Sequence, residues 1–153
     1  MRQASLHRRQ VLFGSVCERR MIVLPGAGGV KPVTRFSDAL FIADRPVTKG
    51  ADWARLVRAA GPALDIVVNN AGWTHRNKPY LEVSEAEFDK VYAVNVKSVY
   101  LSALHAVPVL RSRGGGCFVN IASTAGVRPR PGLTVYNSSK GAVNLMSKSL
   151  AVE

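Results

Sequence analysis

Short, mainly apolar runs without internal alternation constrain the fold of this chain more than any other feature. The runs lie at residues 39–43, 65–68 and 117–122. Continuous apolar strands are typical of a parallel sheet that helices cover on both faces. Longer stretches with helical spacing separate the runs, and such alternation is characteristic of the α/β class. We therefore predict an α/β fold built on a parallel sheet.

Helical signals occupy the segments between and after these runs. Ser84 and Glu87 have the spacing of a capping box, in which each side chain accepts a hydrogen bond from the other residue's backbone N–H. The periodicity after this box places a polar residue, Asn95, on the core face of the helix. The Gly61-Pro62 pair ends an earlier helical segment. We expect helices over residues 51–60, 84–95, 96–111 and 136–153.

The composition describes one globular domain and excludes several other classes. Of the 153 residues, 47% are hydrophobic, which is too many for a disordered chain. No run of about 18 apolar residues predicts a membrane span. Cys17 and Cys117 lie 100 positions apart with no His-rich neighbourhood. We therefore expect neither a disulfide framework nor a metal site, and we favour a cytoplasmic location.

The net charge of +11 is unevenly distributed along the chain. Residues 1–50 carry nine Lys or Arg and three Asp or Glu, residues 51–100 carry six of each, and residues 101–153 carry six and one. Proteins that bind single-stranded nucleic acid interleave basic with aromatic residues, and this chain does not. We therefore predict no nucleic-acid partner and no membrane partner, and we give the charge little functional weight.

Polar residues cluster where an open parallel sheet holds its ligands, at the carboxyl ends of the predicted strands. Residues 69–72 follow the second run, and Ser123 follows the third. Tyr136 and Lys140 are four residues apart, which puts them on one face of the last helix. Taken singly, these features are more often a turn, a buried amide or a surface pair. Their order along the chain allows them to converge at one site.

Four motifs occur in a distinctive order: Asn69-Asn70-Ala71-Gly72, the helix break at Asn95-Val96, Ile121-Ala122-Ser123, and Tyr136-Asn137-Ser138-Ser139-Lys140. Together they resemble the short-chain dehydrogenase/reductase family, strongly over residues 63–153 and faintly back to about residue 39. The resemblance implies an incomplete Rossmann-like, doubly wound parallel sheet with three α/β/α layers. Residues 39–153 would form a partial NAD(P)-binding domain. Residues 1–38 would be a basic segment without a recognisable pattern, as in disordered tails.

The resemblance also implies an oxidoreductase that transfers hydride between NAD or NADP and a carbonyl or secondary alcohol. Tyr136 would act as the acid/base, and the Lys140 ammonium one turn away would favour its phenolate form. Ser123 would hold the substrate oxygen, and Asn95 would support a proton path to Lys140. The implied catalytic residues are Asn95, Ser123, Tyr136 and Lys140. The implied cofactor contacts are Asp44, Asn69, Ala71, Gly72, Tyr136 and Lys140.

Two further expectations concern partners and completeness. The family implies a small-molecule substrate and a homo-oligomer for the intact protein. Trp73, His75 and Tyr80 lie in the loop after the second run, where they would either line the substrate site or pack at the surface. Its glycine-rich cofactor turn is not recognisable, because residues 26–29 have the wrong glycine spacing and come too close to the Asn69 strand. The chain also stops within the Tyr136 helix. We therefore expect an incomplete dehydrogenase, with a non-catalytic remnant that has at most a binding role as the alternative.

Overall fold

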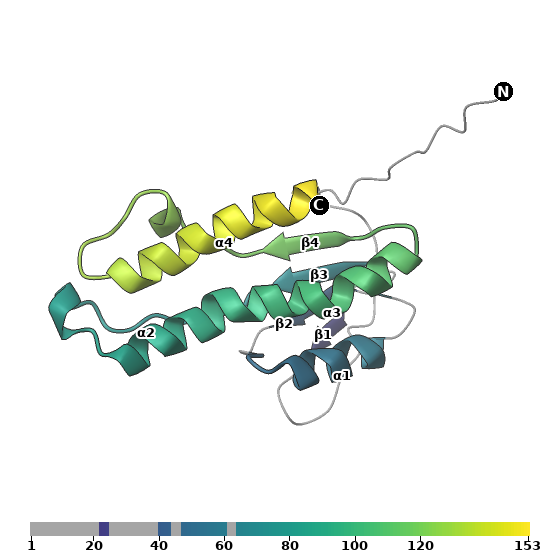
Figure 1. Ribbon diagram of the computed structural model, residues 1–153, viewed down its shortest axis with the longest axis horizontal. Coiled ribbons are helices and arrows are strands. Elements are labelled where there is room, and N and C mark those ends of the chain that lie inside the picture. The colour runs from purple at the N-terminus through teal and green to yellow at the C-terminus, as the bar shows by residue number, and fades with distance from the viewer. Residues whose placement is uncertain (1–21, 25–39, 44–46, 61–63) are drawn as a thin grey trace.

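The computed structural model describes residues 22–24, 40–43, 47–60 and 64–153, and these contain one sheet of four parallel strands (Figure 1). The strands are β1 (Ile22–Leu24), β2 (Leu40–Ala43), β3 (Ile66–Asn69) and β4 (Cys117–Asn120). Asn69 lies beside Ala43 on one side and Asn120 on the other. The predicted parallel sheet is confirmed, and β2, β3 and β4 match the three apolar runs to within two residues.

Helices connect and follow these strands. The elements are α1 (Gly50–Ala60), the 3-10 turn η2 (Tyr80–Glu82), α2 (Glu85–Tyr92), the π turn η3 (Ala93–Lys97), α3 (Ser98–Ser112), the 3-10 turn η4 (Thr124–Gly126) and α4 (Thr134–Val152). The predicted capping box is present at the start of α2, where Glu87 N donates to Ser84 Oγ at 3.3 Å and Ser84 N donates to Glu87 Oε2 at 2.9 Å. The helix break predicted at Asn95 is the π turn η3, which joins α2 to α3 without a loop.

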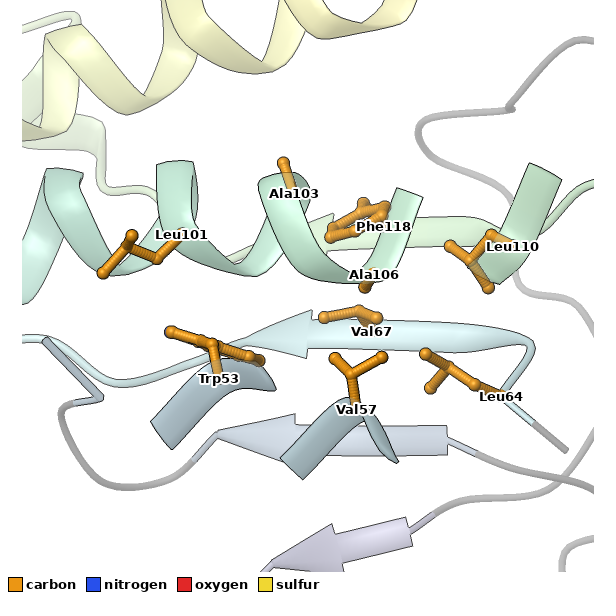
Figure 2. Close-up of a cluster of buried hydrophobic side chains, with 9 residues drawn as sticks. All are labelled: Trp53, Val57, Leu64, Val67, Leu101, Ala103, Ala106, Leu110 and Phe118. Atoms are coloured by element: carbon orange, nitrogen blue, oxygen red, sulfur yellow. The ribbon is translucent and has the colours of Figure 1, made fainter. Parts of the chain in front are cut away.

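The main core lies between the sheet and the helices α1 and α3 (Figure 2). Trp53 and Val57 lie one turn apart on α1 and point toward Val67 of β3 and the facing side of α3. The Trp53 side chain is fully buried, and its Nε1 donates to Val47 O at 3.0 Å. The rest of the cluster consists of Leu64, Leu101, Ala103, Ala106, Leu110 and Phe118.

The described helices that flank the sheet all pack on one of its sides. Phe118 belongs to the core with α1 and α3, and Asn120, two residues later on the same side of β4, donates to Ser147 of α4 at 2.9 Å. Val119 faces the other side and is 36% exposed. The described residues therefore provide the sheet and one of the two expected helical layers. Their strands follow chain order, so the reversal of a doubly wound sheet is not among them.

Two features of the chain differ from the expectations. β1 lies within residues 1–38, for which no pattern was predicted, and pairs in parallel with β2. The continuous helical stretch Glu85–Ser112 is long and apolar enough to span a membrane, with a mean hydropathy of 1.3, but half of its apolar window is buried inside the fold. A core helix has the same properties, so this stretch is only weak support for a span. Asp44 and residues 26–29 lie outside the described residues.

Candidate active site

The predicted site residues that the structure describes gather at the carboxyl ends of β3 and β4 (Figure 1). The loop after β3 carries Ala71 and Gly72, the loop after β4 carries Ser123, and the first two turns of α4 carry Tyr136 and Lys140. α4 begins at Thr134, so Tyr136 lies inside the first turn. Three segments far apart in sequence therefore meet at this edge of the sheet.

Lys140 is the most deeply buried cation at this edge, with 4% of its surface exposed. Its Nζ donates to the Ile121 carbonyl oxygen at 2.8 Å and lies 5.9 Å from the centre of the Tyr136 ring. Burial lowers the pKa of this ammonium below its usual value, because removal from water disfavours the charged form. Within the described part of the chain it makes this single hydrogen bond, so two of its three N–H donors remain for a ligand.

Asn95 ties the loop after β3 to α4 from within the π turn. Its Oδ1 accepts from Trp73 N at 2.8 Å, and its Nδ2 donates to Trp73 O and to Ser139 Oγ, both at 2.9 Å. Ser139 Oγ in turn donates to the Tyr136 carbonyl oxygen at 2.7 Å. The π turn brings the amide of Asn95, which is 2% exposed, against the Trp73 backbone and the Ser139 hydroxyl. Single π turns are frequent at functional sites.

Gly72 provides the backbone surface between Lys140 and Asn95. A Cβ at this position would lie 3.5 Å from Lys140 Nζ and 3.8 Å from Asn95 Oδ1. The glycine itself is exposed, so the missing side chain leaves an open face beside a buried ammonium. A ligand hydroxyl can approach both the backbone and the ammonium there.

Ser123 reaches α4 through the short turn η4. Its Oγ accepts from Ala125 N at 3.2 Å and caps η4; among the described residues it makes no hydrogen bond to Tyr136. η4 packs directly on the helix, because a Cβ at Gly126 would fall 2.6 Å from the Lys140 carbonyl carbon. Ser123 and Lys140 are therefore held in a fixed relation by backbone contact.

Asn69 has a packing role in the structure. Its Nδ2 donates to Ser102 Oγ at 2.8 Å and to Asn120 Oδ1 at 2.7 Å, and Asn120 continues the network to Ser147 of α4. These bonds join β3, β4, α3 and α4 beneath the site. Its predicted cofactor contact remains a prediction, as does that of the half-buried Ala71; the predicted contact of Asp44 lies outside the described residues.

Sequence reasoning missed two contributors to this geometry. Ser139 is part of the sequence motif but was given no role, yet it links Asn95 to the backbone of Tyr136. Gly126 was not singled out. Ser139 could have been found from its position, because it is a hydroxyl residue on the core face of a helix. Gly126 could have been found because it is a glycine two residues before the charged, proline-rich segment that begins at Arg128. The described residues contain no cluster of three or more His, Cys, Asp or Glu that could hold a metal ion.

The comparison with protein families decides the assignment. The sequence model described as short chain dehydrogenase matches residues 30–153. The chain belongs to the short-chain dehydrogenase family. Its predicted α/β, Rossmann-like class is thereby confirmed, since the similar solved structures below are family members with that fold.

Several relatives of the chain are named as enzymes. It is 56% identical over 110 residues to 4-formylbenzenesulfonate dehydrogenase of Comamonas testosteroni, covering 70% of this chain and 44% of the relative. It is 38% identical over 97 residues to cyclopentanol dehydrogenase of Comamonas sp. (strain NCIMB 9872), covering 63% of this chain and 38% of the relative. The crystal structure of 3-ketoacyl-(acyl-carrier-protein) reductase from Brucella melitensis complexed with NADH is 39% identical with a TM-score of 0.67, over 74% of this chain and 50% of that one. The chain thus spans half or less of their lengths.

Proposed function

We propose that the whole protein is an NAD(P)-dependent oxidoreductase that interconverts a small-molecule carbonyl and its alcohol, with Tyr136 as the acid/base. The observation that carries the proposal is the position of Lys140, a buried ammonium 5.9 Å from the Tyr136 ring and anchored to Ile121 O. The Lys140 ammonium can stabilise negative charge that develops on the Tyr136 oxygen while a proton is transferred. Ser123 would hold the substrate oxygen.

The described residues fit a nicotinamide cofactor. Two free N–H donors of Lys140 and the exposed backbone of Gly72 face the same region, which suits a ribose with its hydroxyl groups. The cofactor, when bound, supplies or accepts hydride. Lys140 and Gly72 would orient it, Asn95 would hold the Gly72–Trp73 backbone in place, and Tyr136 would donate or accept the proton at the substrate oxygen.

The relatives support this reading. Two of them are named as dehydrogenases of a small aldehyde or alcohol, and the similar reductase structure is complexed with NADH. A homo-oligomer also belongs to the proposal, and the exposed Tyr100 and Leu104 on α3, each 51% exposed, support it. A cytoplasmic location, expected from the spacing of the cysteines, completes the proposal.

The test is Tyr136→Phe in the whole protein, with Tyr100→Phe as the matched control. Positioned acid–base groups contribute about 10²–10⁴-fold to rate, so we expect kcat to fall by that range with cofactor affinity nearly unchanged. The Tyr100 hydroxyl makes no hydrogen bond among the described residues, and Phe keeps the ring on the proposed subunit surface, so this variant should keep wild-type kcat. A Tyr136→Phe enzyme with undiminished kcat would remove the acid/base assignment.

The second candidate is a non-catalytic protein that binds a partner. An open groove between β4 and α4 favours it, because its lining includes the exposed apolar side chains of Val127 and Leu145. Titration with NADH and NADPH, followed by the fluorescence of the reduced nicotinamide, separates the two candidates. Saturable binding supports the oxidoreductase, whereas no binding by a folded protein supports the remnant.

A further inference from the structure

Two loops from different parts of the chain meet beside the candidate active site. Residues 73–80 follow Gly72, and residues 127–133 lead into α4. Asn77 Nδ2 donates to Pro131 O at 2.7 Å. Gly132 adopts a φ of +72°, and a Cβ there would fall 2.1 Å from Asn77 Oδ1. The two loops are therefore in close contact and cannot shift independently at this point.

The backbone of Arg130 is fixed on both sides within this contact. Its carbonyl oxygen accepts from Asn137 Nδ2 at 2.9 Å, and Asn137 is the residue after Tyr136. Pro129 and Pro131 flank Arg130, and proline rings restrict the backbone at their own position and at the residue before. The chain thus fixes the backbone of one arginine next to the helix turn that carries Tyr136.

The charges on the two loops are unbalanced. Residues 73–80 and 127–133 contain Arg76, Lys78, Arg128 and Arg130 and no Asp or Glu. Lys78 is neutralised by Glu87, with Nζ and Oε2 2.7 Å apart. The three arginines are exposed. In the part of the chain that the structure describes, their guanidinium groups take part in no ion pair or hydrogen bond.

We propose that Arg130 anchors a carboxylate or sulfonate group of the substrate, with Arg76 and Arg128 adding positive potential from the same pair of joined loops. The inference rests on the proposed function and names its substrate class: carbonyl compounds or alcohols that carry an organic anion away from the reacting carbon. A guanidinium forms paired hydrogen bonds with such planar or tetrahedral anions. Its fixed backbone means that binding costs less ordering.

The phosphates of the cofactor are the competing anion. In a Rossmann-type sheet the pyrophosphate lies at the helix that follows the first strand, whereas Arg130 precedes α4, after β4. We therefore assign the unpaired charge to the substrate. The two assignments predict different kinetics, because a cofactor contact affects every substrate equally.

The experiment compares 4-formylbenzoate, 4-formylbenzenesulfonate and the neutral 4-methylbenzaldehyde as substrates of the whole protein. Arg130→Gln is the test variant, and Arg58→Gln is the control, because Arg58 is equally exposed but lies in the last turn of α1. We expect Arg130→Gln to lower kcat/KM roughly tenfold or more for one or both anions, given the strength of charge-assisted hydrogen bonds. The neutral aldehyde and the Arg58→Gln variant should show wild-type values.

The comparison also distinguishes the carboxylate from the sulfonate, and a substrate contact of Arg130 from a cofactor contact. Loss confined to the sulfonate or to the carboxylate identifies which anion Arg130 accepts. An equal loss for all three aldehydes, with a raised KM for the cofactor, would assign Arg130 to the cofactor and overturn the inference. No loss for either anion would overturn it as well. If the wild-type protein turns over none of the aldehydes, calorimetric titration with 4-formylbenzoate still tests Arg130, since wild type should bind it more tightly than Arg130→Gln. The titration with NADH and NADPH tests the proposed function separately.

Discussion

Gly126 lies in η4 against the backbone of α4, where an added methyl group would push Ser123 away from Lys140. A Cβ there would fall 2.6 Å from the Lys140 carbonyl carbon and 2.8 Å from both Lys140 O and Gly141 N. Carbon atoms in contact are normally about 3.5–4.0 Å apart, so the methyl would be roughly 1 Å too close. All three atoms belong to the backbone of α4, which cannot yield as a side-chain end would.

The expected cost of Gly126→Ala follows from two opposing effects. Overpacking against a rigid neighbour costs typically about 1–3 kcal/mol, and contact with three backbone atoms argues for the upper part of that range. Replacing glycine also restricts the unfolded chain, which returns about 0.4–1 kcal/mol. We therefore expect the free energy of unfolding to fall by about 1–2.5 kcal/mol. Activity should fall too, because η4 and Ser123 must move away from Lys140.

Denaturant unfolding of the whole protein, followed by circular dichroism, measures this loss. Gly141→Ala is a control within the same contact, because its Cβ would be 3.4 Å from Gly126 O and should cost less. Gly50→Ala is a second control, at the first residue of α1, where the nearest atom is the end of the His105 side chain at 3.4 Å. A Gly126→Ala protein within about 0.5 kcal/mol of wild type, with unchanged kcat, would refute the argument that backbone contact holds the site together.

Two further substitutions test the elements beside the site. The Lys78 hydrogen bond, followed by the Ser84 backbone N–H, lowers the pKa of Glu87 from 4.5 to about 2, so its stabilising effect should be complete above pH 4.5 and lost as the pH falls toward 2. Glu87→Gln should therefore lower stability at pH 7 and flatten its decline below pH 4.5 in denaturant unfolding, and identical pH profiles for both proteins would contradict this. Asn95→Ala leaves the Trp73 backbone N–H and carbonyl without their hydrogen-bond partner. The free energy of unfolding should therefore fall by about 1–3 kcal/mol, and kcat should fall too. An Asn95→Ala protein as stable as wild type would show that Asn95 does not hold this loop in place.

Local signals explain why much of the fold and site could be predicted. The capping box of Ser84 and Glu87 needs only residues three apart, and both of its hydrogen bonds form. Tyr136 and Lys140 share a helix face for the same reason. The break at Asn95 was predicted from the family motif, but its form as a π turn was not. The hydrogen bonds that accompany this turn join Asn95 to Trp73, 22 residues away in sequence.

Non-local packing explains what could not be predicted. Helical periodicity places Phe88 with Val91 on one face, yet Val91 is fully buried while Phe88 is 44% exposed and stacks on Tyr92 with ring centres 4.6 Å apart. The face of a short helix at the border of the core depends on which neighbour covers it, and no local pattern encodes that. The contact of Gly126 with Lys140 could not be predicted from sequence either, because it joins residues from two different elements.

The position of the charges in the fold indicates more about function than the net charge of the chain does. The net charge of +11 carried little weight as a total, because the excess lies toward the ends of the sequence. Folding brings two of those late cations, Arg128 and Arg130, to a loop that is bonded to the loop of Arg76. Exposed charges contribute little to stability even when they are paired, so stability gives no reason for the unpaired arginines on these two loops. Selective loss of the anionic substrates in Arg130→Gln would show that the fold arranges this charge for binding.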